Sequence, residues 1–141
     1  MSRITDKMGE IQTYLKELES FVPRDLGLYR KDILRKAACE RFAEKIIEAG
    51  TDLAFFIIKL KKFRKPNDDP DAFSILTEEK IIDEPLSRRL QSAKGMKNII
   101  AHQYGKIDDT IVFEAVSKEL PRDMKQLLKE SGEAVRAKPS P

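Results

Sequence analysis

The residues best suited to chemistry lie together between Lys97 and Tyr104, in the octapeptide KNIIAHQY. This stretch contains the only histidine of the 141-residue chain, together with an ammonium group, an amide and a phenol. On a helix, Asn98 and His102 are four residues apart and share a face, and Lys97 lies close beside that face. An imidazole can move a proton near neutral pH, and an ammonium group can hold a phosphate oxygen. The set could therefore bind a phosphodiester.

The same residues could also cleave RNA, because RNA carries its own nucleophile in the 2′-hydroxyl group. A base that removes the hydroxyl proton and a cation that stabilises the developing charge would suffice, so we expect neither a metal nor a cofactor. Lys94 and Arg89 lie upstream in the same helical pattern and could add contacts to RNA phosphates. We expect Arg88, in contrast, to face solvent.

A purely structural interpretation of the octapeptide stays open. A histidine near a helix C-terminus often only binds the last carbonyl groups, and Asn98 could do the same. Tyr104 could be a core aromatic residue whose hydroxyl group reaches the rim. On spacing alone, this structural role is the more common outcome for such residues.

Apolar residues at intervals of three and four predict helices along the chain, and no segment has the alternation of a strand. Pro23 should end the first helix, and Asp83 should cap the helix that leads into the octapeptide. Asp109 or Thr110 should cap the last helix, which Pro121 should kink or split. The predicted helices cover residues 2–22, 29–63, 72–79, 84–104 and 110–133, with a loop over residues 64–71.

The second predicted helix, from Tyr29 to Phe63, has the most apolar surface. Gly50 interrupts its pattern without changing the period, so we expect a single helix. From Leu53 to Ile58 the helix is apolar on nearly all sides, which predicts either a central place in the bundle or a contact with a second subunit. Its main apolar stripe consists of Leu34, Ala38, Phe42, Ile46, Ala49, Leu53, Phe56 and Leu60.

Length and composition fit one helical domain, residues 1–133, followed by a tail, residues 134–141, that we expect to be disordered. The net charge is only +3, but the run from Lys59 to Lys65 is strongly basic and could attract phosphates or simply occupy a solvated helix end. Cys39 should be a buried structural thiol. We find no signal-peptide pattern and no apolar run long enough to span a membrane, so we expect a cytoplasmic protein.

The octapeptide, followed by GKID at residues 105–108, resembles the signature of HEPN-domain proteins of the HepT-like toxin group. That signature is an arginine, four to six residues, a histidine, any residue and a tyrosine. The order of predicted helices is similar over residues 1 to 130, including a Leu-Pro pair at Leu120. One departure is that Lys97 stands where the arginine is expected, while Met96 and Gly95, at the alternative spacings, are not basic. Lysine keeps the charge but lacks the planar guanidinium fork.

The resemblance implies an antiparallel up-and-down bundle of four to five helices that forms a homodimer, with the two motifs facing a shared cleft. It implies a metal-independent endoribonuclease toxin whose antitoxin, a minimal nucleotidyltransferase, transfers AMP to Tyr104. His102 would be the general acid/base, Lys97 would steady the phosphate and Asn98 would support them. One alternative is a catalytically weak or inactive module that docks the nucleotidyltransferase or a nucleotide. Another is an unrelated bundle with a coincidental motif, in which His102 would be buried.

Overall fold

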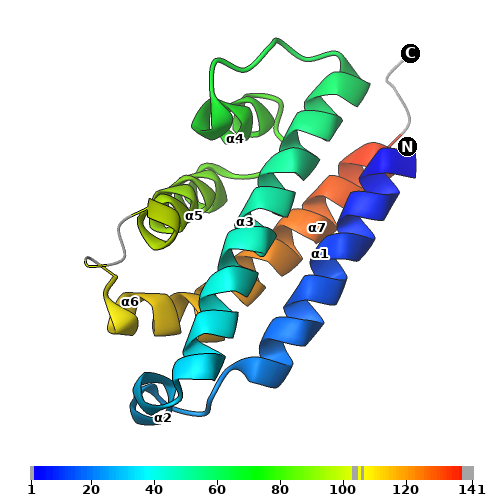
Figure 1. Cartoon of the computed structure of the whole chain (residues 1–141). Helices are drawn as coiled ribbons and strands as arrows, with labels where there is room; N and C mark the ends of the chain where they lie inside the picture. The colour runs from blue at the N-terminus through cyan, green and yellow to red at the C-terminus, as the bar shows by residue number, and fades with distance from the viewer. Residues whose placement is uncertain (1, 103–104, 106, 138–141) are drawn as a thin grey trace.

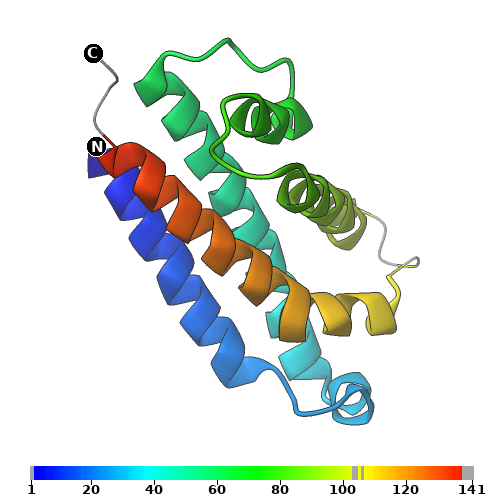
Figure 2. The same cartoon turned by 180° about the vertical axis from the view of Figure 1, so that it is seen from behind.

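The computed structural model describes residues 2–102, 105 and 107–137. Within these residues every regular element is helical, which confirms the predicted all-α class (Figure 1). The long helix α3 is central, with α1 and α7 along one side and α4 and α5 along the other (Figures 1 and 2). In chain order the elements are α1 (Ser2–Phe21), α2 (Leu26–Lys31), α3 (Ile33–Lys61), α4 (Asp69–Glu78), α5 (Glu84–His102), α6 (Asp109–Glu114), the π-helical segment η2 (Ala115–Glu119) and α7 (Leu120–Arg136).

The central position of α3 accounts for most of its unusual apolar surface. Leu53, Ala54, Ile57 and Ile58 are all buried inside the protomer. Of the run from Leu53 to Ile58, only the two phenylalanines remain half-exposed. The run is therefore covered chiefly by neighbouring helices of the same chain, and the second-subunit explanation is not needed for it.

The prediction of one helix from Tyr29 onward is wrong. Tyr29 is buried in the separate short helix α2, and α3 begins only at Ile33. Asp32 causes the break, because its backbone is not helical (φ −95°, ψ 89°) and its carboxylate accepts a hydrogen bond from the backbone N–H of Arg35 at 3.0 Å. An aspartate in this position is a strong helix N-cap. The expected linker thus contains a helix of its own.

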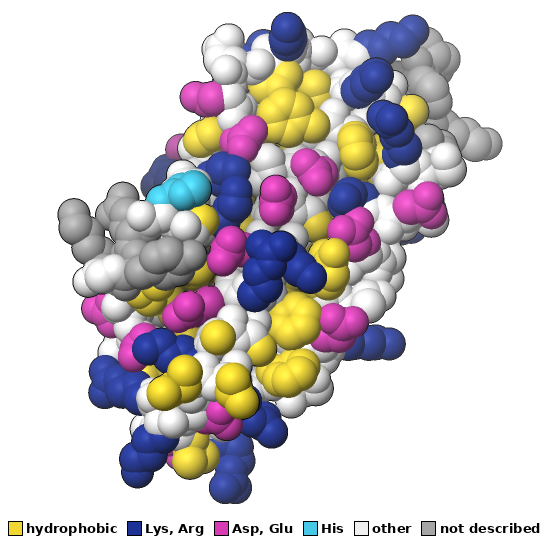
Figure 3. All heavy atoms as spheres, in the orientation of Figure 1, with side chains coloured by type: hydrophobic (Ala, Val, Ile, Leu, Met, Phe, Trp, Pro, Cys, Tyr) yellow, Lys and Arg dark blue, Asp and Glu magenta, His cyan; other side chains and the backbone are white. Residues whose placement is uncertain are grey.

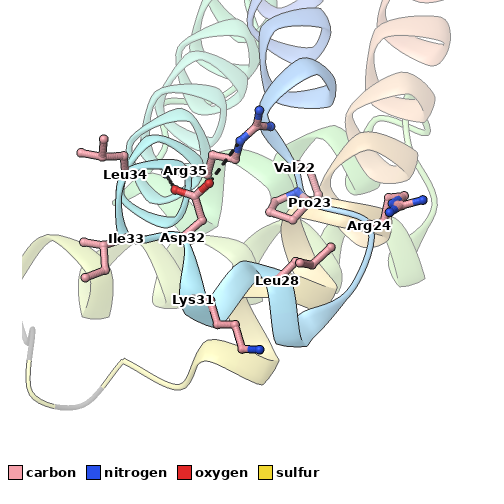
Figure 4. A pocket seen from close by; sticks show the side chains of 9 residues that line it. All are labelled: Val22, Pro23, Arg24, Leu28, Lys31, Asp32, Ile33, Leu34 and Arg35. Carbon is pink, nitrogen blue, oxygen red and sulfur yellow. Dashed lines mark hydrogen bonds and ion pairs between the residues drawn. The ribbon is translucent and has the colours of Figure 1, made fainter.

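The predicted apolar stripe of α3 is also too long at both ends. Leu34 is 83% exposed and Leu60 is 40% exposed, so neither belongs to the core. Figure 4 shows Ile33 and Leu34 at the start of α3, where their side chains point away from α1 and α2. A hollow of about 670 Å³ lies at this corner of the molecule. The first turn of α3 extends past the helices that cover the rest of it.

The loop after α3 is shorter than predicted, because α4 begins at Asp69 rather than at Ala72. Asp68 caps α4 through a 2.8 Å hydrogen bond from the N–H of Asp71. Arg64 closes the loop with two hydrogen bonds to Asp71, of 2.7 and 2.9 Å, and two to Glu78. The Arg64 guanidinium lowers the pKa of the Asp71 carboxyl group to about 2. One residue of the basic run is therefore committed to internal ion pairs.

Helix α5 begins as predicted, with a 2.9 Å hydrogen bond from the N–H of Leu86 to the side chain of Asp83. The cap of α6 is Asp108, not Asp109 or Thr110, because its carboxylate accepts from the N–H of Thr110 at 2.9 Å. None of the described helices is long and apolar enough to cross a membrane.

Pro121 splits the last helical region, as predicted. It lies in the first turn of α7, directly after the wide turns of η2. Proline has no N–H to donate to the preceding turn, and a π-helical turn is one way of accommodating that loss. Helix α7 then continues to Arg136, three residues beyond the expected domain boundary, and residues 138–141 of the expected tail lie outside the described part of the chain.

Helix α7 approaches α3 closely at Gly50. A Cβ atom at this position would lie 2.9 Å from Cε and 3.0 Å from Sδ of Met124, which is itself buried. Gly50 therefore leaves the α3 helix unbroken, as expected, and makes room for a side chain of α7.

Replacement of Gly50 by valine should lower the free energy of unfolding by about 1–3 kcal/mol, because the new side chain displaces Met124 from a packed site. The same replacement at Gly9 in α1, where a Cβ atom would meet nothing within 4 Å, should be nearly neutral. Urea unfolding followed by circular dichroism measures both variants. Equal losses at the two positions would mean that position 50 does not depend on the close approach of α7.

Candidate functional site

The polar residues of the motif lie on the surface at the end of α5. His102 is the last residue of that helix and is exposed, as is Asn98 one turn earlier. Figure 3 shows the histidine, in cyan, on the outer surface of the molecule. Lys97 is half-buried beside them. This placement contradicts the interpretation in which His102 is buried in an unrelated bundle.

The helical period of α5 explains why these side chains face outward. Leu86, Leu90 and Ile100 are buried, and α5 packs against α3, α4 and α7. Ile100 lies between Asn98 and His102 in sequence, two residues from each, and therefore on a different side of the helix. Burial of the leucine and isoleucine face turns the amide and the imidazole toward solvent.

Lys94 connects α5 to α4. Its Nζ atom lies 2.6 Å from Oδ2 of Asp69, and its side chain is only 16% exposed. Burial is the largest single influence and lowers the pKa of this ammonium group, but the hydrogen bond to Asp69 and the other nearby polar and charged groups together raise the pKa above its ordinary value. Lys94 is eight residues, or about 12 Å of helix, from His102. A phosphate bound by Lys94 would have to compete with the Asp69 carboxylate.

Arg89 connects α5 to α7 in a similar way. Its Nε atom donates to Oδ1 of Asp123 at 2.9 Å, and the Asp123 side chain is only 7% exposed. A second, longer hydrogen bond of 3.4 Å reaches Oε1 of Gln126. Arg88 faces solvent as expected and pairs with Glu84 at 2.7 Å. The last two turns of α5 thus carry Lys97, Asn98 and His102, whereas Lys94 and Arg89 lie further back along the same helix, in contacts with other helices.

Tyr104, the predicted acceptor of AMP, lies outside the described residues, as does Gln103. The chain beyond them is anchored at the start of α6. Lys36 of α3 forms a 2.8 Å ion pair with Oδ1 of Asp109, and Arg30 of α2 donates to Oγ1 of Thr110 at 3.0 Å. These contacts could not be predicted from the sequence, because no local pattern indicates that α2 and α3 contact α6.

An apolar groove flanks the motif where α5 faces α6. It has a volume of about 380 Å³ and is lined by Met96, Ile99, Ile107 and Ile111, among others. Ile99 is 39% and Ile111 is 59% exposed, and Ile99 precedes His102 by three residues. We refer to these four side chains as the α5–α6 groove. The exposure of Ile111, the third residue of α6, could not be predicted from the apolar spacing of the sequence.

Cys39 is fully buried, as predicted for a structural thiol. Burial raises its pKa to about 11, which keeps the thiol protonated at neutral pH. A protonated thiol is a poor nucleophile. Among the described groups that could do chemistry, the exposed imidazole of α5 remains the best candidate, with an amide and an ammonium group on the adjoining helical surface.

Comparison with known proteins identifies relatives of the whole helical region. The model of the family described as Ribonuclease HepT-like matches residues 11–131. The chain is 26% identical over 125 residues to the mRNA nuclease HepT of Shewanella oneidensis, which covers 89% of this chain and 92% of that protein. It is 27% identical over 114 residues to the tRNA nuclease HepT of Aphanizomenon flos-aquae, covering 81% of this chain and 78% of that protein.

A solved structure extends the likeness to three dimensions. The tri-AMPylated HEPN toxin of Shewanella oneidensis, in complex with an MNT antitoxin, superposes with a TM-score of 0.84 at 25% sequence identity. The match covers 92% of this chain and 96% of that chain. The likeness therefore concerns the complete bundle and not the octapeptide alone.

Proposed function

We propose that this chain, which belongs to the ribonuclease HepT-like family, is the toxin of a toxin–antitoxin pair and cleaves RNA with the motif at the end of α5. The observation that carries the proposal is the exposure of His102 and Asn98 on one face of that helix. A substrate as large as RNA can reach an imidazole there without rearrangement of the core. The names of the relatives as mRNA and tRNA nucleases support the same class of substrate.

The proposed reaction uses the 2′-hydroxyl group of the substrate. Attack of its oxygen on the adjacent phosphorus forms a 2′,3′-cyclic phosphate and releases the 5′-oxygen of the next nucleotide, which takes up a proton. His102 accepts or supplies a proton as general acid/base. Lys97 stabilises the negative charge on the phosphate, and Asn98 orients the phosphate or the imidazole. No step requires a metal ion.

We further propose that the protein acts as a homodimer formed through the α5–α6 groove. One protomer exposes one imidazole, and a second copy would place another opposite it. Burial of Leu53, Ala54, Ile57 and Ile58 removes most of the earlier candidate interface in α3, whereas Ile99 and Ile111 remain exposed next to the motif. A contiguous apolar surface beside a polar site is typical of a protein–protein interface.

The proposed partner that silences the toxin is a minimal nucleotidyltransferase that transfers AMP from ATP to Tyr104. Support comes from the structural relative, which is AMPylated and held by an MNT antitoxin. Both partners would act in the cytoplasm. A second candidate function follows from Lys97, which lacks the bidentate geometry of an arginine. On that view the chain is a catalytically weak module that chiefly docks the nucleotidyltransferase or a nucleotide.

Purified protein incubated with RNA in EDTA should cleave it, and His102→Ala should abolish the cleavage, because the substitution removes the only imidazole of each protomer. Gel analysis of the products and their 2′,3′-cyclic ends measures the reaction. Lys97→Arg should retain or increase the rate. If neither the parent protein nor Lys97→Arg cleaves RNA, the docking module is the better description.

Substitution Ile111→Lys should convert the dimer to a monomer, because a charge in the centre of an apolar interface is costly to bury. Analytical ultracentrifugation measures the change, and RNA cleavage should fall with it. Leu34→Lys is the matched control, since it places the same charge on an exposed apolar residue that does not line the groove. A dimer that survives Ile111→Lys would place the interface elsewhere.

Co-expression with the proposed nucleotidyltransferase partner should add one or more AMP units to the chain. Mass spectrometry of the intact protein and of its peptides would locate them at Tyr104, and Tyr104→Phe should remove them. AMP on another residue would contradict the assignment of Tyr104, and the absence of both adduct and stable complex would contradict the partner.

A further inference from the structure

A second surface, which the proposed reaction does not use, combines aromatic rings with cations. It is a hollow of about 510 Å³ at the C-terminal end of α3, next to the start of α1. Phe55, Phe56 and Phe63 line it and are each half-buried, which leaves part of their ring area open to solvent. We call this the aromatic–basic groove. In Figure 3 hydrophobic side chains lie between Lys and Arg side chains at the end of the molecule where α3 finishes.

Four cations line the same groove, namely Arg3, Lys59, Lys62 and Lys65. The described lining contains no carboxylate, and none of the four forms an ion pair with another described residue. Such a surface attracts a polyanion.

Arg64 shows that this grouping is selective within the basic run. Although it lies between Lys62 and Lys65 in sequence, its guanidinium group is turned to Asp71 and Glu78 of α4. Of the five cations of the run, Arg64 closes a loop, three share a groove with the phenylalanines, and Lys61 does neither.

The helix dipole alone does not account for this arrangement. Cations are favoured near the C-terminus of a helix, and that effect is sufficient for Lys59 and Lys62. The dipole of α3 does not explain the position of Arg3, which belongs to α1. The guanidinium carbon of Arg3 lies 5.5 Å from the centre of the Phe56 ring. Nor does the dipole require half-exposed phenylalanine rings beside the charges.

The groove is held in shape by the way α3 ends. Lys62 adopts a left-handed backbone conformation (φ 58°), and its N–H donates to the carbonyl groups of Ile58 and Lys59. The N–H of Phe63 donates to the carbonyl of Ile58 at 3.1 Å. These bonds fold the chain back at the end of the helix, so that Phe63 lines the same hollow as Phe55 and Phe56.

We infer that the aromatic–basic groove binds a single-stranded segment of RNA outside the cleavage site, with phosphates on the cations and bases stacked on the phenylalanines. Proteins that bind single strands combine a cationic track with aromatic side chains in this way. The inference rests on the proposed function for the identity of the RNA as substrate. The histidine and this end of the molecule are visible on one face in Figure 3, so a single strand can contact both.

The test uses full-length His102→Ala protein, so that RNA binding is measured without cleavage. Fluorescence anisotropy with a labelled single-stranded RNA, over a range of salt concentrations, gives the affinity and its salt dependence. Lys59→Gln combined with Lys65→Gln should weaken binding and reduce the slope of log affinity against log salt by about 2. Lys16→Gln combined with Lys129→Gln, which removes two exposed lysines from α1 and α7, is the matched control and should leave the slope unchanged.

The aromatic contribution is tested by Phe63→Leu in the same background. Leucine keeps an apolar side chain but removes the stacking surface, so affinity for the single strand should fall about ten-fold. Affinity for fully double-stranded RNA, whose bases are already stacked, should change little. Circular dichroism of each variant confirms that the helices are intact.

The outcomes separate this inference from the proposed function. If the double lysine variant and the Phe63→Leu variant both bind RNA as tightly as the His102→Ala protein, the groove is not an RNA-binding site. That conclusion would hold even if protein with an intact His102 cleaves RNA. Equal weakening by the control pair would also overturn the inference, because the effect would then be general electrostatics. If the groove variants weaken RNA binding but the parent protein does not cleave RNA, the groove is supported as an RNA-binding site and the proposed nuclease activity is wrong.

Discussion

The orientation of α5 is the constraint on which the functional surface depends. Its apolar face is buried against α3, α4 and α7 through Leu86, Leu90 and Ile100. Two ion pairs, from Lys94 to Asp69 and from Arg89 to Asp123, hold it to α4 and α7. A helix fixed in this way has only one side left for solvent, and its final turn carries the imidazole on that side. Rotation of α5 would bury the imidazole and leave hydrocarbon exposed.

Much of this arrangement could be predicted from the sequence, because it follows from local rules. The helical period places Asn98 and His102 on one face, Asp83 caps α5, and Pro121 interrupts the last helical region. The errors lie where two local signals compete. The apolar period runs through Asp32 without a gap, so periodicity predicted one helix, while the capping carboxylate divides it into α2 and α3. The helix breaks at Asp32 because its carboxylate can accept a hydrogen bond from a free backbone N–H group at the start of α3. Apolar periodicity contains no information about such caps.

Contacts between distant segments were beyond the sequence. Lys94 and Arg89 have the residue type of phosphate ligands, but their carboxylate partners lie far away in the chain. The same holds for the basic run at the end of α3. Arg64 forms ion pairs with α4, whereas Lys59, Lys62 and Lys65 line the aromatic–basic groove with Arg3 of α1. Whether a cation forms an internal ion pair or remains available to a ligand depends on which carboxylates the tertiary structure brings near it. The amino-acid composition does not indicate these neighbours.

The π-helical segment η2 reconciles two demands on the end of the chain. Upstream, α6 is clamped to α2 and α3 through Thr110 and Asp109. Downstream, α7 packs the Met124 side chain against Gly50 of α3. A π turn amounts to one surplus residue in an otherwise regular helix. The surplus residue adjusts the phase between the two helices. The orientation of α7 about its own axis can therefore follow the core, while that of α6 follows its contacts with α2 and α3.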